Sequence, residues 1–223
     1  MDFSKTRISL SRKPTDYSKV QWLIGQIVRG KEMFYPRVVA GSYLNVGCGP
    51  NIEPNFVNID YSWRPGLDMC CDIRRGLPLP DAIVGGVYSE HCLEHLALAD
   101  AKAFLADCHR VMRPGAYIRM VVPDLEMYAR AYIADLEGQS IEMPNQQFGN
   151  RTGVNRPVAM INDLFYGSGH RFHYDFRTLA EVLGGAGFKS PTKRAFRLGE
   201  DPRLLVDDKF RACESLYVEA VRP

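Results

Sequence analysis

The sequence predicts a single α/β domain with a doubly wound, mostly parallel sheet of seven strands. Short apolar runs that end in turn residues or acids fill the first half, as expected for strands buried on both faces of a parallel sheet. Helical patterns alternate with strands from residue 99 onward, and two strand-like segments lie near the end. A length of 223 residues fits one domain with one sizeable core.

The strands are expected where apolar runs are short and bounded by turn signals. They are predicted at 42–46, 56–59, 67–71, 83–88, 116–122, 188–197 and 213–221. Amphipathic spacing predicts the helices at 99–112, 124–136 and 175–186. Arg113-Pro114-Gly115 must end the first of these helices, because proline and glycine interrupt helical hydrogen bonding.

Two segments lie outside this alternation. Residues 1–36 form an N-terminal extension whose helix, at 16–29, carries apolar residues at helical spacing. We expect this helix to pack on the core, with a lid as the alternative. Residues 138–174 are rich in Gly, Asn, Gln and Pro, and predict an insertion with one short helix at 158–165.

Composition excludes several classes of protein. The formal net charge of +2 gives no electrostatic reason to expect a nucleic-acid partner. No apolar run approaches the roughly 20 residues of a membrane span. Residues 1–14 lack the apolar stretch of a secretory signal, so we expect a cytoplasmic protein. The six cysteines form no CxxC pair and are expected to be reduced.

A glycine turn and two acids follow the first three predicted strands. The first strand runs into Gly47-Cys48-Gly49, where a sharp bend can approach a ligand without a Cβ in the way. The second and third strands end in Asp60 and Asp72, which could accept ribose hydroxyls and an adenine amine. Each acid alone could equally be a turn or helix cap. Together the three features describe a nucleoside pocket, although Ile52 stands where a dinucleotide-binding motif needs glycine.

A family resemblance rests on six motifs in order. They are LNVGCGP, NIDYS, DMCCDIRRGLPLPDA, VYSEHCLEHL, HRVMRPGAYIRMVVPD and YDFRTLAEVLGGAGF. Together they resemble the class I S-adenosylmethionine (SAM)-dependent methyltransferases of the Methyltransf_11 kind. More narrowly, they resemble a bacterial group often associated with cell-envelope polysaccharide genes. The resemblance covers residues 42–188 and implies a Rossmann-like fold, SAM as cofactor and S-adenosylhomocysteine as product.

The resemblance also implies which residues surround SAM. The expected cofactor-binding residues are Asn45, Gly47, Cys48, Gly49, Asp60, Tyr61, Asp72, Ile73, Ser89 and Glu90. Two departures from the family stand out. Asn45 replaces an acid that pairs with the substrate ammonium, so we expect its role to be altered. Residues 50–55 are too few for a crossover helix, so we expect a loop there.

The run His91-Cys92-Leu93-Glu94-His95 allows several interpretations. It matches H-x-x-E-H, the zinc signature of inverted zincins, in which the two histidines share a helical face. No third ligand for such a site is evident, and we assign no metal ligand. Some ubiquinone-pathway O-methyltransferases carry acid-x-x-Glu-His here with a divalent metal, but His91 replaces the first acid. His95 is otherwise a buried, hydrogen-bonded histidine.

The expected reaction is methyl transfer from SAM to a small-molecule or glycan-linked acceptor, at oxygen. A hydroxyl acceptor needs a general base, and the candidates are His91 first, then His95 and His170. The insertion is expected to cover the acceptor site as a lid that moves about glycines 167 and 169. Its expected lining residues are Tyr166, His170, His173 and Tyr174. A loop pinned by its aromatics is the alternative.

Two other functions remain open on the sequence. A protein that binds SAM without catalysis, as a regulatory or scaffold module, would explain Asn45 and the missing helix. A zinc-dependent hydrolase would use the histidines at 91 and 95.

Overall fold

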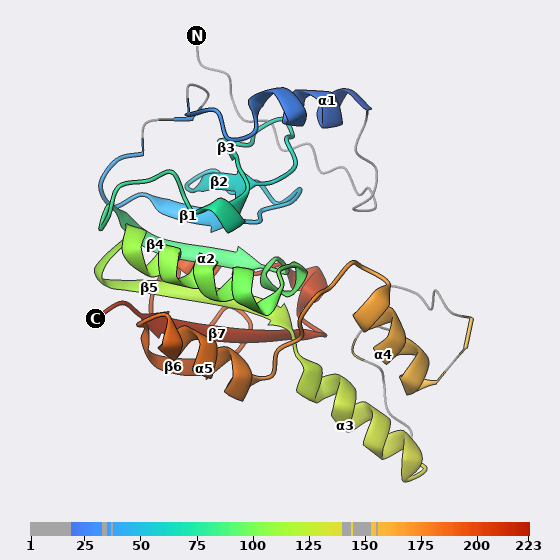
Figure 1. The fold of residues 1–223 in the computed structure, drawn as a ribbon. Coiled ribbons are helices and arrows are strands. Elements are labelled where there is room, and N and C mark those ends of the chain that lie inside the picture. The colour runs from blue at the N-terminus through green and yellow to red at the C-terminus, as the bar shows by residue number, and fades with distance from the viewer. Residues whose placement is uncertain (1–18, 33–34, 37, 140–143, 145–152, 155) are drawn as a thin grey trace.

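The computed structural model describes residues 19–32, 35–36, 38–139, 144, 153–154 and 156–223. A seven-stranded sheet in the order β3-β2-β1-β4-β5-β7-β6 runs through the molecule (Figure 1). Its strands are β1 (Tyr43–Val46), β2 (Val57–Asp60), β3 (Met69–Cys70), β4 (Val84–Glu90), β5 (Met112–Pro123), β6 (Lys189–Arg194) and β7 (Ser215–Val221). The first five strands are parallel and β7 is antiparallel to both of its neighbours. The predicted fold class is confirmed.

Most predicted elements lie within a few residues of their observed bounds. The α-helices are α1 (Lys19–Val28), α2 (Leu98–Val111), α3 (Leu125–Leu136), α4 (Pro157–Tyr166) and α5 (Phe176–Gly185). The 3-10 turns are η2 (Ile73–Arg75), η3 (Leu93–His95), η5 (Pro202–Leu204) and η6 (Lys209–Arg211). β1 joins β2 without a helix, as the short segment 50–55 predicts. None of the helices in the described part of the chain is both long and apolar enough to cross a membrane.

One strand starts earlier than expected. β5 begins at Met112, before the predicted turn at 113–115, because Met112 already pairs with Val84. The register then shifts, so that Gly86 pairs with Tyr117 and the proline and glycine form an irregularity within the strand. Gly115 has a φ of 79° there and donates its amide to Arg222.

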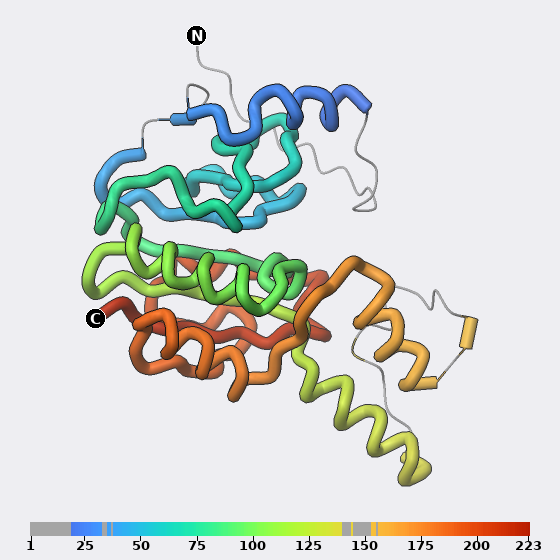
Figure 2. The backbone as a smooth tube through the Cα atoms, in the orientation of Figure 1, coloured from blue at the N-terminus to red at the C-terminus, as the bar shows by residue number. Residues whose placement is uncertain are grey.

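The two faces of the sheet are covered differently. α2 and α5 cover one face and close the main core, which includes Phe104, Leu105 and Leu183 (Figures 1 and 2). The other face carries alternate side chains of the same strands, including Tyr88 and Tyr217, which form a second core with Leu204. Within the described residues, the segment 195–214 covers this second face with 3-10 turns in place of α-helices.

α3 and α4 extend from the edge of the sheet where β5 ends (Figure 1). Asp124 caps α3 by accepting the amide of Glu126, which turns the chain from strand to helix. Tyr128 and Ala131 of α3 pack against Met160 and Leu164 of α4 in a small separate core. α4, the helix predicted within the insertion at 138–174, therefore packs on α3, which precedes the insertion, and part of the insertion lies outside the described residues.

The N-terminal helix corrects an expectation. Among the described residues, α1 buries only Gly25, while Val20, Trp22, Leu23 and Ile27 stay exposed, with Trp22 at 62%. Packing of its apolar face on the core is therefore wrong for the part of the chain that the structure describes. The helix is attached through Arg29, whose guanidinium lies 3.7 Å from the Tyr61 ring centre.

A buried ion-pair network fixes the segment that covers the second face. The side chain of Arg119, on β5, is fully buried and donates to both oxygens of Asp207, at 2.7 and 2.5 Å. It also donates to Glu219 on β7 at 2.9 Å and to the carbonyls of Ala195 and Leu198. The network therefore ties the covering segment, at 195, 198 and 207, to β5 and β7.

Removal of Arg119 should be far more costly than removal of a surface cation. Arg119→Met keeps the volume but leaves two buried carboxylates without their counter-charge, so we expect a loss of about 3–5 kcal/mol in the free energy of unfolding. Denaturant titration measures this loss. Arg130→Met, which breaks the exposed pair with Glu126, should cost less than about 1 kcal/mol. Equal losses in the two variants would contradict the role assigned to the network.

Candidate functional site

The glycine turn after β1 folds back against the end of β2. The amides of Gly47 and Cys48 both donate to the carbonyl of Ile59, at 2.8 and 3.1 Å. Gly47 and Gly49 have φ values of 70° and 51°, in the region that favours glycine. A Cβ at Gly47 would lie 2.2 Å from the sulfur of Cys92, whereas one at Gly49 would meet nothing within 4 Å. Packing on Cys92 therefore requires glycine at 47, and open space adjoins position 49.

Asp60, at the end of β2, is held in place by this turn. One carboxylate oxygen accepts the amide of Gly49 at 2.8 Å, and the other accepts the amide of Ser62 at 2.7 Å. Because each oxygen has two lone pairs, both can still accept a hydroxyl. Tyr61, which follows, stacks its ring against Arg29, the residue after α1, and accepts the Arg29 Nε–H on its carbonyl.

Asp72 follows β3 and caps η2. Its carboxylate accepts two side-chain hydrogen bonds from Arg74, at 2.8 and 2.6 Å, and the hydrogen bonds of Arg74 lower its pKa against the effect of burial. Arg74 is exposed, and an exposed ion pair is worth only about 0–1 kcal/mol, so a ligand can displace it. Ile73 packs its side chain partly against the main core.

Four further residues predicted to bind the cofactor are buried or hydrogen-bonded to other parts of the protein. Asn45 is buried on the second face and donates both hydrogens of its amide, to Asn51 and Asn58, which fixes the loop after β1. Glu90 accepts the amide of Asp208, and burial raises its pKa. Cys48 and Ser89 are buried. Asn45 and Glu90 thus have structural partners that the motif does not predict.

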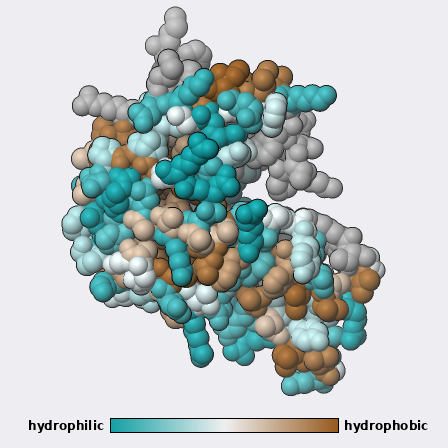
Figure 3. Space-filling model, viewed as in Figure 1, coloured by the Kyte–Doolittle hydropathy of each residue, from teal (hydrophilic) through white to brown (hydrophobic). Residues whose placement is uncertain are grey.

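The carboxyl ends of the parallel strands meet a hollow in the surface. Figure 3 shows the outline of the molecule indented between the part that carries α1 and the part that carries α3 and α4. A polar cavity of about 530 Å³ lies at the opposite edge, lined by Tyr43, Arg113 and Arg203 among others. Ligands of open parallel sheets bind outside the carboxyl ends of the strands, so we place the site at the indented edge.

His91 is the first predicted base, and the structure engages both of its ring nitrogens. Nε2 lies 2.8 Å from the hydroxyl of Ser215, which donates its own hydrogen to the carbonyl of Arg211. Nε2 must therefore donate, and Nδ1 faces Glu94 Oε1 at 3.4 Å. His91 also has a φ of 47°, a strained backbone of the kind found at functional sites. This geometry disfavours His91 as the base.

The zincin interpretation of this segment is not supported. Leu93–His95 is a three-residue 3-10 turn, so the residues at 91 and 95 do not share the face of an α-helix. The imidazole of His91 is bound to Ser215. Among the described residues, the group that could hold a metal contains Glu94, His95 and His170, without His91.

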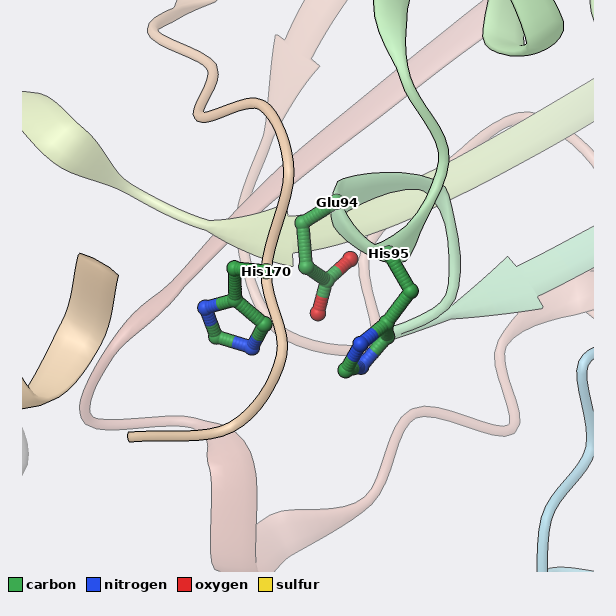
Figure 4. Close-up of side chains that lie close together, drawn as sticks. All are labelled: Glu94, His95 and His170. Carbon is green, nitrogen blue, oxygen red and sulfur yellow. The ribbon is translucent and has the colours of Figure 1, made fainter. Parts of the chain in front are cut away.

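Glu94, His95 and His170 form the carboxylate–histidine cluster of this edge. Figure 4 shows the two imidazoles on either side of the Glu94 carboxylate, with His170 on a separate segment of the chain. The rings of His95 and His170 have centres 4.8 Å apart and meet edge to face. Glu94 is buried, and although burial opposes ionisation, the nearby imidazoles of His91, His95 and His170 lower its pKa.

The segment after α4 is anchored at this cluster. The amides of Arg171 and Phe172 donate to the carbonyl of Glu94, at 2.7 and 3.2 Å. Of the four predicted lining residues, only His170 belongs to the cluster. His173 stacks on Phe165, Tyr166 is 81% exposed, and Tyr174 is fully buried against the core, which corrects its placement at the site. Sequence spacing gave no signal for the contact between Glu94 and His170.

Cys92 joins the glycine turn to the cluster. Its sulfur packs on Gly47, and burial together with the charges of Glu94 and Asp60 raises its pKa to about 12. The thiol is therefore neutral at physiological pH, and it serves as a small apolar contact. Cys92 therefore lies between the glycine turn after β1 and the carboxylate–histidine cluster.

Part of the sequence matches a known family of domains. Residues 48–120 match the family model described as a methyltransferase domain, Methyltransf_11. No curated protein matches the sequence. Among solved structures, a SAM-dependent methyltransferase of Mesorhizobium loti is 17% identical with a TM-score of 0.50, and the match covers 91% of this chain and 97% of that one.

Two further solved structures are similar. A SAM-dependent methyltransferase of Thermotoga maritima, a possible histamine N-methyltransferase, is 14% identical with a TM-score of 0.51, over 91% of this chain and 89% of that one. A SAM-dependent methyltransferase of Archaeoglobus fulgidus is 16% identical with a TM-score of 0.50, over 89% and 93%. At these identities the likeness shows the fold. With the family match over residues 48–120, the chain contains a methyltransferase domain.

Proposed function

We propose that the protein transfers the methyl group of SAM to a hydroxyl of a small-molecule or glycan-linked acceptor. The observation that carries this proposal is the carboxylate–histidine cluster, which lies beside the glycine turn at the carboxyl end of β4. Transfer to a hydroxyl releases a proton, and imidazole is well suited to accept it near neutral pH. The cluster supplies an imidazole next to the glycine turn, where we expect the cofactor.

The cofactor site fits a nucleoside. Asp60 offers a carboxylate with lone pairs still free on both oxygens, to which we assign the ribose hydroxyls. Gly49 borders open space. Asp72 and Ile73 flank the adenine once Arg74 is displaced. SAM supplies a methyl group on a sulfonium, which is electrophilic without further activation, so the protein must mainly orient the two reactants.

His95 is the base that we favour. It is exposed at the edge, whereas His91 is bound to Ser215 and His170 donates Nδ1–H to the carbonyl of Leu164. The edge of the His170 ring holds His95 in orientation, and the buried Glu94 carboxylate stabilises the imidazolium that forms. Glu94 and His170 are therefore positioning residues in this proposal.

Aromatic side chains at the end of α4 support a proposal for the class of acceptor. Phe165 and Tyr166 expose aromatic surface at the end of α4, next to the anchored segment. Aromatic rings of this kind stack on the apolar faces of sugars. The bacterial group that the sequence resembles also suggests a cell-envelope glycan, and we propose a sugar hydroxyl as the methylated group.

The first test concerns Asp60. Asp60→Asn keeps the size of the side chain but removes its charge, and a hydrogen bond to a charged group is worth about 1.5–3 kcal/mol. We expect the affinity for S-adenosylhomocysteine to fall about ten- to a hundredfold in calorimetric titration. Asp81→Asn, at an exposed side chain that pairs with Arg110, should bind like the wild type. Unchanged affinity in a folded Asp60→Asn protein would place the ribose elsewhere.

The second test concerns His95 and the reaction. With labelled SAM and a panel of glycans and small hydroxylated acceptors, we expect methylated product from the wild type. His95→Ala should lower kcat about 10²–10⁴-fold with little change in SAM affinity. His109→Ala, on α2 with its ring against Phe188 and outside the cluster, should retain activity. Tight SAM binding without product from any acceptor would reject catalysis and favour a SAM-binding regulatory or scaffold module.

A further inference from the structure

We propose that Glu94, His95 and His170 bind one divalent transition-metal ion. Each residue offers one ligand atom, and the three atoms lie within 4.8 Å of one another. The ligands come from two chain segments that meet at the carboxyl edge of the sheet, the turn after β4 and the segment after α4 (Figure 4). This assignment replaces the expectation from the sequence that the protein has no metal ligand.

The Glu94 carboxylate lacks the partners that a buried charge requires. It is 1% exposed, and neither oxygen accepts a hydrogen bond from the described residues. Nδ1 of His91 lies 3.4 Å from Oε1 and is too distant for a strong hydrogen bond. Buried carboxylates are normally paired, hydrogen-bonded or bound to a metal. A cation held against both oxygens would satisfy this side chain.

His170 has the arrangement of a metal-ligating histidine. Its Nδ1 lies 2.7 Å from the carbonyl of Leu164, and because a carbonyl can only accept, Nδ1 carries the hydrogen. Nε2 is then the nitrogen with a free lone pair in the neutral ring. Metal-bound histidines usually donate their second ring nitrogen to a carbonyl or carboxylate in this way.

The backbone brings the two segments together without help from an ion. Arg171 and Phe172, directly after His170, donate their amides to the carbonyl of Glu94. For metal–nitrogen distances of about 2.0–2.1 Å and tetrahedral angles, ligand atoms stand about 3.3 Å apart. Rotation of the side chains by a small amount would therefore close the cluster around an ion.

The chemistry of the ligands selects the class of ion. Two imidazoles and one carboxylate suit zinc and neighbouring first-row divalent ions, whereas magnesium and calcium prefer oxygen ligands alone. His95 is exposed, so an ion has access from solvent and keeps a coordination position open. Three protein ligands with an open position are typical of catalytic sites and not of structural ones.

The role of the ion rests on the proposed function. An acceptor hydroxyl that takes the open position would lose its proton to solvent water more readily, because a bound divalent cation lowers the pKa of a coordinated oxygen. His95 would then act as a ligand of the ion in place of acting as the base itself. Binding of the ion does not depend on methyl transfer, so it can be tested without SAM or acceptor.

The test is a Zn²⁺ titration of tag-free protein that a chelator has stripped of metal. We expect one ion per chain in calorimetry, and at least about tenfold weaker binding in His95→Ala and in His170→Ala. His95 is exposed, so its variant should fold even if the His170 variant does not. His109→Ala and Cys213→Ser are matched controls that remove another histidine and the exposed thiol, and both should bind like the wild type.

Substitution with Co²⁺ identifies the ligands. We expect visible absorption of a nitrogen- and oxygen-ligated ion without a thiolate-to-metal band, and its loss in His95→Ala. No binding to the wild type, binding that survives in His95→Ala, or a thiolate band would overturn the site. Methyl transfer that continues in fully stripped protein rejects the catalytic role of the ion and leaves the proposed function intact. Zn²⁺ binding without any methyl transfer supports the site and rejects the proposed function.

Discussion

Arg119 carries a full positive charge into the interior of the sheet, and two carboxylates that are distant in the sequence neutralise it. Asp207 lies on the segment that covers the second face, and Glu219 lies on the neighbouring strand β7. A charge at this depth is tolerated only when its hydrogen bonds are complete, so the covering segment must adopt one position. The segment that covers the second face contains no α-helix. The ion pairs therefore fix its position on the sheet, as helix packing fixes α2 and α5 on the other face.

The same constraint reaches the functional edge. Asp208, next to Asp207, donates its amide to Glu90 at the end of β4. Farther along, the Ser215 hydroxyl accepts a hydrogen bond from Nε2 of His91. This bond fixes His91, the strained residue that precedes the cluster. The buried network on one face thereby positions the carboxyl end of the central strand, where Glu94 and His95 follow in a short turn.

The edge divides into two halves with different chemistry. The ends of β1, β2 and β3 provide a carboxylate and a glycine turn, which suit the ribose and adenine of a nucleoside. The end of β4 and the segment after α4 provide two imidazoles and a buried carboxylate, which suit proton transfer or metal binding. Cys92 packs between the halves as a neutral thiol. A methyl group delivered from the first half would therefore meet its acceptor at the second.

The sequence predicted the strands, their order of appearance and the acids at their ends, because these depend on local apolar runs and on the rule that parallel strands share one carboxyl edge. It did not predict what the side chains contact. Asn45 and Glu90 stand at cofactor positions of the motif, yet their hydrogen bonds go to the protein itself. The contact of Glu94 with His170 arises from an insertion folded back on the sheet, for which no periodicity exists. Arg119 resembles any strand cation in the sequence, since its partners lie far along the chain.

A crystal structure with bound S-adenosylhomocysteine tests the central claim most directly. The account predicts that the ribose hydroxyls lie on Asp60 and that the sulfur faces the side of Cys92 where Glu94 and His95 lie. A nucleoside in the polar cavity at the opposite edge, against Arg113 and Arg203, would contradict it. So would a sulfur that points away from the carboxylate–histidine cluster.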